Sequence, residues 1–391
     1  MSVDLRTRIE AEAESLTAIR RDLHQHPELM FEEVRTSGIV VEELNRLGIE
    51  MKTGLGGGTG IVAWLPATQP GGGTVALRAD MDALPIFEET GLPYASLTEG
   101  KMHACGHDGH TTILLGVARA LSAEQVRTNN VLLVFQPAEE GGGGADVMCR
   151  EGILNGLLGE KPDVMYGLHG WPARAQGALS TRIGPLMAST DQFYVTITGK
   201  GAHAAAPEEG IDPIVAAALC VTALQTLVSR NIGPAQNAVL TVGTINGGSA
   251  TNIIPEKAEF SGTIRTVDAE VRRTMRSRFI QLVESLCAGY GARVDVRWEE
   301  GYPVTVNDQW ATERFIHIAG GDNVRLEPHP KMGAEDFSYY GAHVPACFFF
   351  VGLGRPGEEN PPGLHNPKFD FNDEVIPGCV EMMCRLALSP I

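Results

Sequence analysis

Three features are scarce or missing in this chain of 391 residues, and each absence removes a class of function. No basic run or stripe interrupts the excess of 48 Asp and Glu over 31 Lys and Arg, and the net charge is −17. Such a charge repels nucleic-acid phosphates and anionic lipid surfaces. The apolar stretches are too short or too interrupted for a signal peptide or a membrane span. We therefore expect a cytoplasmic protein whose partners include neither nucleic acid nor a membrane.

Disulfide-type cysteine spacing is also missing. The seven cysteines are an odd number and are spread over the whole chain. This distribution fits a reducing compartment, where most thiols behave as small buried apolar side chains. Only Cys105 has neighbours that suggest chemistry.

The length exceeds the size at which a single hydrophobic core usually stops growing, so we expect one large domain and a smaller one. Short runs rich in Val, Ile and Leu, bounded by Gly and Pro, alternate with helical stretches. This alternation is typical of an α/β domain in which helices flank a mostly parallel sheet. The predicted elements are helices over 5–23 and 34–47 and strands over 74–79, 131–135, 163–168 and 346–352.

The order of elements changes in the middle of the chain. Strands are predicted over 192–199, 238–245, 257–266 and 292–298, and helices over 211–229 and 268–288. The resulting β-α-β-β-α-β order indicates a ferredoxin-like α+β unit. Because sheet segments lie on both sides of it, we expect an insertion into the large domain. Residues 1–182 and 296–391 would form the large catalytic domain, and residues 183–295 the inserted one.

The segment HACGHDGH, residues 103–110, places one thiol and three imidazoles within eight residues. Cys105 and His107 stand two positions apart, which directs both side chains to the same side of an extended or loop backbone. Thiolate and imidazole suit zinc and other late first-row divalent ions. By itself the segment is equally compatible with a buried cysteine beside surface histidines.

Further candidate ligands follow the predicted strands. In an open α/β sheet the carboxyl ends of the strands meet at one edge, where ligand sites occur. Carboxylates and imidazoles that follow several strands would therefore converge near Cys105 and His107, which favours a metal site. These residues are Asp80, Asp82, Glu139, Glu140, His169 and His365.

The adjacent acids Glu139 and Glu140 suggest a division of labour, because neighbouring side chains rarely coordinate the same ion without strain. One would bind metal, and the other would take a proton from an activated water and return it to a departing amine. Asp82 is a candidate for orienting an imidazole ligand. The alternative for Asp82 is simple capping of a strand end.

At this point the chain resembles the metal-dependent aminoacylase and carboxypeptidase superfamily, and within it the branch of hippurate hydrolases and auxin-conjugate hydrolases. The resemblance is long, and its motifs occur in the family's order. The matching strings are RRDLHQHPEL (20–29), LRADMDALP (77–85), HACGHDGH (103–110), VFQPAEEGGGGA (134–145), GLHGWP (167–172), GKGAHAAAPEEGIDP (199–213), GGSATNIIPEKAEFSGTIRT (247–266), MGAEDFSYY (332–340) and GLHNPKFDFND (363–373).

The resemblance implies two divalent metal ions per subunit, Zn, Mn, Co or Ni. It makes Glu139 the catalytic base and Cys105 the bridging ligand. The remaining ligands would be His107, Glu140, His169 and His365.

The resemblance also assigns roles to the inserted domain, which would act as a lid and mediate a homodimer or a dimer of dimers. His203 would help to polarise the scissile carbonyl, from a partner subunit in some arrangements. Asn252 and Arg265 match positions that hold the substrate carboxylate, a role that suits the planar fork of arginine. The residue pattern alone marks His203 only as a turn histidine.

The predicted function is metal-dependent hydrolysis of N-acyl or N-aroyl amino acids, with hippurate as the model substrate. A metallo-dipeptidase or carboxypeptidase is the first alternative, because the same chemistry serves both. A protein that binds a small amino-acid derivative without catalysis is the second. The pair Glu139 and Glu140 argues against the second, since a binding protein needs no general base.

Overall fold

The computed structural model describes residues 3–69 and 71–391, so the first two residues of the predicted catalytic domain lie outside the described part. The chain divides into two compact units. The first extends to Leu186 and takes up the chain again over Val306–His329 and Asp336–Ile391. The second contains Met187–Thr305 and Pro330–Glu335.

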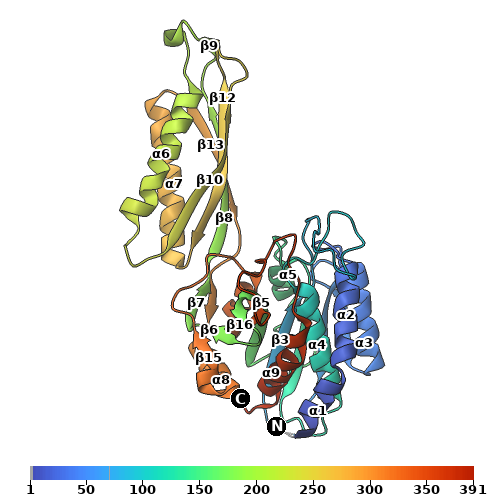
Figure 1. Cartoon of the computed structure of the whole chain (residues 1–391). Coiled ribbons are helices and arrows are strands. Elements are labelled where there is room, and N and C mark those ends of the chain that lie inside the picture. The colour runs from blue at the N-terminus through green and yellow to red at the C-terminus, as the bar shows by residue number, and fades with distance from the viewer. Residues whose placement is uncertain (1–2, 70) are drawn as a thin grey trace. The chain divides into compact units, whose positions relative to one another are not determined.

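A mixed sheet of eight strands forms the centre of the first unit in the described residues (Figure 1). Its middle strands are parallel, as the sequence predicts, because β3 pairs in parallel with β4 and β5, and β5 with β16. Antiparallel pairs β1–β2, β2–β4 and β16–β6 extend it on both sides. The order is β1 (Glu50–Leu55), β2 (Gly60–Leu65), β4 (Asn130–Gln136), β3 (Thr74–Asp80), β5 (Val164–Ala175), β16 (Ala346–Gly354), β6 (Leu179–Thr181) and β15 (Val324–Leu326).

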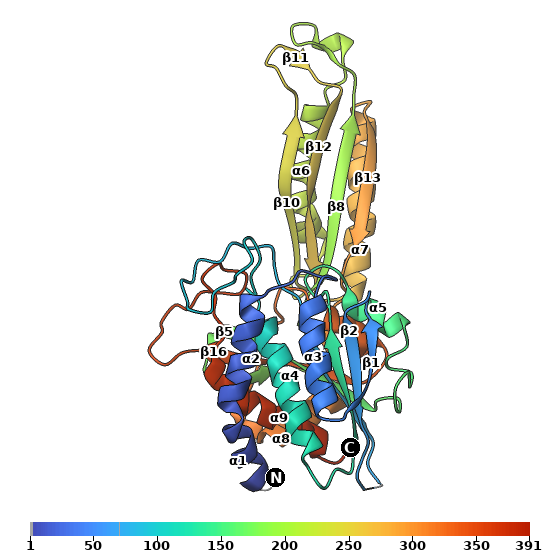
Figure 2. The ribbon, with the colours of Figure 1, turned by 90° about the vertical axis from the view of Figure 1, so that its right-hand side faces the viewer.

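Alternate residues of the central strands enter one large apolar core, as the two-residue period of a strand requires. Val75, Leu77 and Ala79 of β3 face this core, whereas Arg78 does not belong to it. Helix α4 packs on β3 and lies beside α2 and α3, as Figure 2 shows. The helices of this unit are α1 (Val3–Ala11), α2 (Ala13–Gln25), α3 (Val34–Arg46), α4 (His107–Ser122), α5 (Gly144–Arg150), α8 (Gln309–Ala319) and α9 (Ile376–Leu388), with short turns η2 (Gly321–Asn323), η3 (Asp336–Ala342) and η4 (Asp373–Val375).

The second unit has the predicted ferredoxin-like order. Its four-stranded antiparallel sheet runs β10-β12-β8-β13, and two helices cover one face of it. The elements are β8 (Ser189–Thr198), α6 (Pro213–Asn231), β10 (Ala238–Gly247), β12 (Lys257–Thr266), α7 (Ala269–Gly289) and β13 (Arg293–Glu300). Shorter pieces are β9 (Ala202–His203), β11 (Ile253–Ile254) and η1 (Pro207–Glu209), and β7 (Gly184–Met187) and β14 (Thr305–Asn307) lie where the chain passes between the units.

Two expectations need correction. The boundary expected between residues 295 and 296 falls inside β13, which continues to Glu300 because its alternating pattern pairs with β8 as far as Asp191. In addition, α6 is long and apolar enough to cross a membrane by length and composition. Its buried face, which includes Ala216, Cys220 and Leu224, packs into the core of the second unit.

Candidate metal centre

Cys105 and His107 lie at the start of α4. Gly106 between them has a φ angle of 88°, a left-handed conformation that residues with a Cβ atom rarely adopt. A Cβ atom at this position would also lie 2.9 Å from the Phe371 ring. Both flanking side chains are buried. The glycine therefore allows the chain to enter the helix while the thiol and the imidazole stay close together.

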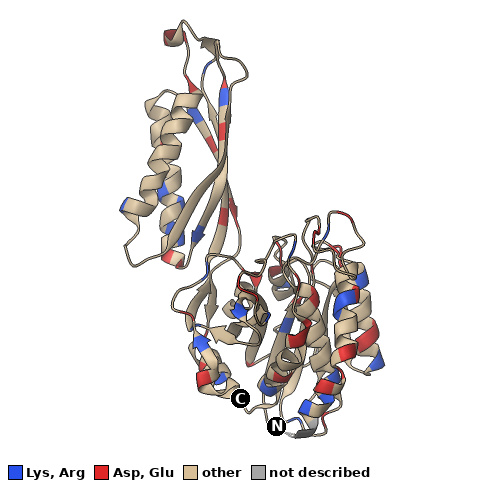
Figure 3. Ribbon diagram, viewed as in Figure 1, with Lys and Arg blue, Asp and Glu red and all other residues tan. Residues whose placement is uncertain are grey.

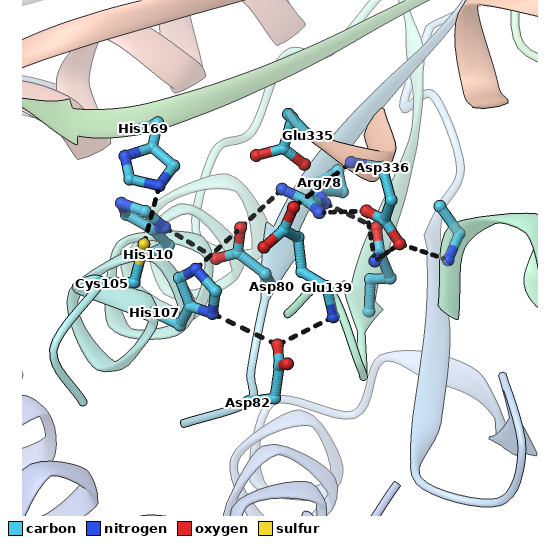
Figure 4. A network of polar contacts seen from close by, with 12 residues as sticks. Arg78, Asp80, Asp82, Cys105, His107, His110, Glu139, His169, Glu335 and Asp336 are labelled. Carbon is cyan, nitrogen blue, oxygen red and sulfur yellow. Dashed lines mark hydrogen bonds and ion pairs between the residues drawn. The ribbon is translucent and has the colours of Figure 1, made fainter. Parts of the chain in front are cut away.

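Two groups of candidate ligands meet at Cys105. The possible ligand atoms of Cys105, His107 and His169 all lie within 4.8 Å of one another, and so do those of Cys105, Glu140 and His365. The Cys105 Sγ atom is 3.4 Å from His169 Nε2 (Figure 4). Two ligands of one tetrahedral zinc ion are about 3.5 Å apart for ordinary Zn–S and Zn–N bond lengths. The structure thus brings together all five predicted ligands, with Cys105 in both groups.

His169 lies inside β5 rather than beyond its end. The strand stays paired with β16 after this position, where His169 faces Phe350, so the apolar run marks only the first part of the strand. The Nδ1 atom of His169 donates a hydrogen bond to the Gly170 carbonyl at 2.8 Å. This contact leaves Nε2, on the Cys105 side, as the nitrogen with a lone pair.

His365 reaches the site from the long loop after β16. Its backbone has a φ angle of 61°, and its N–H donates to the Ala104 carbonyl at 2.8 Å, next to Cys105. Its Nε2 atom lies 3.1 Å from Glu140 Oε1. The side chain remains about half exposed, which leaves this side of the site accessible to solvent.

Asp82 holds the other parts of the site in register. One carboxylate oxygen accepts from the Glu139 N–H at 3.0 Å and lies 3.2 Å from His107 Nδ1. The second oxygen accepts from the Glu140 N–H at 2.9 Å. The contact with Asp82 fixes the His107 tautomer with the proton on Nδ1. A carboxylate that contacts a metal-binding histidine, without binding the metal itself, fixes the tautomer of the ring in this way.

Asp80, a candidate because it ends β3, forms a buried pair with His110, to which the sequence assigned no role of its own. His110 Nδ1 lies 2.7 Å from Asp80 Oδ1, while its Nε2 accepts from the Gly170 N–H at 2.9 Å. Both ring nitrogens are therefore used, and His110 holds the backbone beside His169. The dense cluster of histidines in residues 103–110 was the available signal.

Arg78 anchors the opposite side of the network in Figure 4. Its guanidinium donates to Asp80 at 2.6 Å, to Gln136 at 2.7 Å and to Asp336 at 3.0 Å, all fully buried. Asp336 also accepts from the Ala145 N–H at 3.0 Å. An arginine inside an otherwise apolar strand was the sequence signal for this network.

The electrostatics of the site favour a bound cation. Burial opposes the charged form of His107, but Asp80 and Asp82 outweigh it and raise the pKa of His107 to about 10. Burial, with the charges of Glu140 and Glu139 added, raises the pKa of the Cys105 thiol well above its usual value. A divalent ion would supply the positive charge that allows this thiol to ionise.

The donor set also fits a metal on direct chemical grounds. In the described residues, His107 Nε2 is buried without a hydrogen-bond partner, 3.7 Å from Asp80 Oδ2. Burial and the neighbouring His110 lower the pKa of His169 well below its usual value, so its ring is neutral. Imidazoles, which bind a metal through a nitrogen that has released its proton, a thiol and a carboxylate are ligands that zinc and its neighbours accept.

The remaining predicted residues lie in the second unit. His203 and Asn252 are exposed and adjacent, because β9 pairs with β11 and the Ala204 N–H donates to the Asn252 carbonyl at 3.0 Å. Arg265 lies at the other end of β12, where it contacts the Thr190 hydroxyl. At 3.3 Å per residue the length of β12 separates the two places by about 25 Å. The second unit therefore does not bring Asn252 and Arg265 together.

Comparison with known proteins decides the family. Residues 76–389 match the family described as Peptidase family M20/M25/M40. The chain belongs to this peptidase family. The resemblance predicted from the motifs is confirmed, and with it the fold class and the assignment to hydrolases.

Relatives of the M20 chain include deacetylases and amino-acid conjugate hydrolases. It is 44% identical over 364 residues to N-acetyl-L-cysteine deacetylase of Bacillus subtilis, covering 92% of this chain and 84% of that protein. It is 40% identical to IAA-amino acid hydrolase ILR1-like 4 of Arabidopsis thaliana, covering 93% and 82%. The Bacillus subtilis YXEP protein, described as a dinuclear metal binding peptidase from the M20 family, has 33% identity and a TM-score of 0.83, with 97% and 98% coverage.

Proposed function

We propose that this protein hydrolyses the amide bond of N-acyl or N-aroyl amino acids, hippurate among them, and releases a carboxylate and a free amino acid. Membership of the M20 family supports a metal-dependent hydrolase of small amides. The named relatives that act on N-acetylcysteine and on indole-acetyl amino acids support the acylated substrate class. Cytoplasmic location stays a prediction from composition.

The arrangement of Glu139 and Glu140 is the observation that carries this proposal. Glu140 groups with Cys105 and His365, as a metal ligand would. The Glu139 carboxylate also lies within 4.8 Å of possible ligand atoms of His107 and Glu140, but it is buried and accepts from the Asp336 N–H at 3.3 Å. Two adjacent carboxylates with different surroundings can divide coordination and proton transfer between them.

The chemistry then follows from the residues. Cys105, His107, Glu140, His169 and His365 would hold two divalent ions, Zn, Mn, Co or Ni, which supply Lewis-acid polarisation of the carbonyl and activation of water when bound.

Glu139 takes the proton of the attacking water and gives it to the departing amine. Asp82 keeps His107 in the tautomer that leaves Nε2 for coordination.

The separation within the second unit suggests that two subunits complete each site. His203, which would polarise the scissile carbonyl, and Asn252 lie together, whereas Arg265 is about 25 Å away along the sheet. One amino-acid carboxylate cannot span that distance. Because the family resemblance would bring His203 from a partner subunit, we assign Asn252 beside it to that partner as well, and Arg265 to the other subunit.

The inserted unit offers a surface for such a partner. Helix α6 carries a single charged side chain, Arg230 (Figure 3). Its outer face exposes Ile214, Val215 and Leu219, which are 37–44% accessible. Strand β10 is an edge strand, whose unpaired backbone groups accept a neighbouring strand. A homodimer, alone or paired into a dimer of dimers, would cover both.

The oligomer is tested by light scattering on size-exclusion fractions. Leu219→Asp places a charge on the exposed face and should shift the protein to monomer. Thr222→Asp, on the same outer face of the helix, should also shift the protein to monomer. Glu284→Gln on α7 is the control, which should leave the dimer intact. A wild-type monomer, or a dimer unaffected by both α6 substitutions, would refute this surface.

The activity is tested by following amino-acid release from N-acetyl, N-benzoyl and indole-acetyl amino acids and from dipeptides, before and after chelation. Metal-dependent turnover of the acylated compounds is expected. Glu139→Gln should lower kcat by about 10²–10⁴-fold while metal stays bound. The exposed Glu358→Gln is the matched control. Near-normal turnover of Glu139→Gln would disprove its role as the base.

The same panel separates the alternatives. Preferential turnover of dipeptides would make the protein a metallo-dipeptidase or carboxypeptidase with the same site. Metal binding without turnover of any compound would favour a protein that binds small amino-acid derivatives.

A further inference from the structure

The backbone N–H groups of three consecutive residues, Ala138, Glu139 and Glu140, all donate to buried carboxylates. The N–H groups of Glu139 and Glu140 are accepted by Asp82, as described above. The N–H of Ala138 is accepted by a different carboxylate, Glu33 Oε1, at 2.9 Å. Two carboxylates from distant parts of the chain thus accept from three successive backbone N–H groups.

Ala138 has a left-handed backbone, with a φ angle of 56°. This conformation is unfavourable for a residue with a Cβ atom and persists only when its surroundings hold it. Its carbonyl accepts from the Gly144 N–H at 3.1 Å, and a Cβ atom on Gly142 would lie 2.7 Å from the Ala138 Cβ atom. The direction of the chain at Ala138 determines where Glu139 begins.

Glu33 lies just before α3 and is fully buried. Its second carboxylate oxygen accepts from the Thr59 hydroxyl at 2.7 Å. Burial raises the pKa of Glu33 to about 7, and the negative charge of Asp82 raises it further, whereas the hydrogen bond from Thr59 lowers it. Burying an acid is unfavourable unless its oxygens are satisfied, and Ala138 and Thr59 satisfy both.

We infer that Glu33 is a positioning residue that holds Ala138 in its left-handed conformation and thereby aims the Glu139 carboxylate. The inference rests on the proposed role of Glu139. Glu33 lies outside the motifs that mark the metal site. The hydrogen bonds of its carboxylate go to Thr59 and Ala138, neither of which is a candidate ligand. It acts through one backbone N–H group. A structural role limited to α3 would leave Glu139 unaffected.

A double-mutant cycle distinguishes these two roles. Glu33→Ala should lower kcat by about 10- to 100-fold, the usual cost of a small misplacement, with KM within about 3-fold and metal content unchanged. Glu33→Gln keeps an acceptor for the Ala138 N–H and should recover most of kcat. In the Ala138→Gly background the left-handed conformation needs no support, so Glu33→Ala should cost less than about 3-fold. Equal losses in both backgrounds would overturn the inference.

Hydrogen exchange gives a second readout that needs no substrate. Amides of residues 138–144 should exchange faster in Glu33→Ala, whereas the same amides in the neighbouring exposed variant Glu32→Gln should exchange as in the wild type. Unchanged exchange in that segment would also overturn the inference. If Glu33→Ala does not fold, Glu33→Asp, too short to reach Ala138, takes its place. A wild-type protein inactive on every substrate would refute the proposed function, and exchange would still test Glu33.

Discussion

Asp82 Oδ1 lies 3.2 Å from His107 Nδ1, and both side chains are completely buried. The same oxygen accepts the N–H of Glu139, and the other oxygen accepts that of Glu140. One carboxylate thus fixes an imidazole from the start of α4 and two acids from the loop after β4. Asp82 is the link that makes these two chain segments a single site.

Asp82→Asn should lower metal affinity by about 10- to 100-fold. The amide keeps only one acceptor oxygen, so its NH₂ group faces an N–H donor and the loop loses a contact. Isothermal titration of the metal-free protein with Mn or Zn measures the effect. Asp146→Asn, at an exposed pair with Arg150, is the control. Equal affinities for both variants would show that Asp82 does not orient the site.

Mixing two inactive variants tests whether His203 acts on the partner's site. In a hybrid dimer, the His203→Ala subunit keeps Glu139 and the Glu139→Gln subunit keeps His203. One of the two sites is therefore complete only if each site takes Glu139 from one subunit and His203 from the other. Random exchange through a twofold interface should then restore up to about a quarter of wild-type turnover. If His203 served its own subunit, the mixture would stay as inactive as its components.

His24 should make stability depend on pH. Burial lowers its pKa, but the hydrogen bonds with Asp108 and Glu88 outweigh this and raise the pKa to about 9. A pKa above the unfolded value of about 6.5 means that the contribution is complete below about pH 6.5 and is lost as the pH rises through about 9.

The size of that contribution is at most roughly 3 kcal/mol in the free energy of unfolding. Urea unfolding at about pH 6 and about pH 9.5 should therefore show a gap between the wild type and His24→Gln that narrows at the higher pH. The exposed His317→Gln should show no such change. A gap that is independent of pH would mean that His24 is neutral in the fold.

Much of the fold could be predicted because periodic apolar runs report burial directly. The predicted strand over 257–266 coincides with β12, and the predicted helix over 268–288 differs from α7 by one residue at each end. Strand β1 was missed because it is mostly exposed and lacks an apolar pattern, and its partner β2 was missed although it is apolar and fully buried. The single helix predicted over 5–23 is in fact two helices, α1 and α2, separated at Glu12. The sequence did not reveal this break because the helical spacing of apolar residues continues across it.

The sequence could mark the five metal-ligand candidates because a thiol and imidazoles crowd into residues 103–110 and because acids and imidazoles come after apolar runs. It could not mark Glu33 or the pairing of Asp80 with His110, since these depend on contacts between segments far apart in the chain. The separation of Asn252 from Arg265 also depends on the pairing of strands. Chemistry is therefore easier to read from sequence than the contacts that support it.

Titration of the metal-free protein with Mn or Zn, with turnover of an N-acyl amino acid followed at each step, tests whether hydrolysis requires two metal ions bound at Cys105 and its neighbours. We expect no turnover without metal, and turnover should reach its maximum at about two ions per chain. Cys105→Ala removes the residue shared by both ligand groups, so turnover should no longer rise to a maximum at two ions per chain. Cys149→Ala should still reach that maximum. Full turnover without metal, or maximal turnover at two ions per chain in Cys105→Ala as well, would show that these residues do not form the proposed two-metal site.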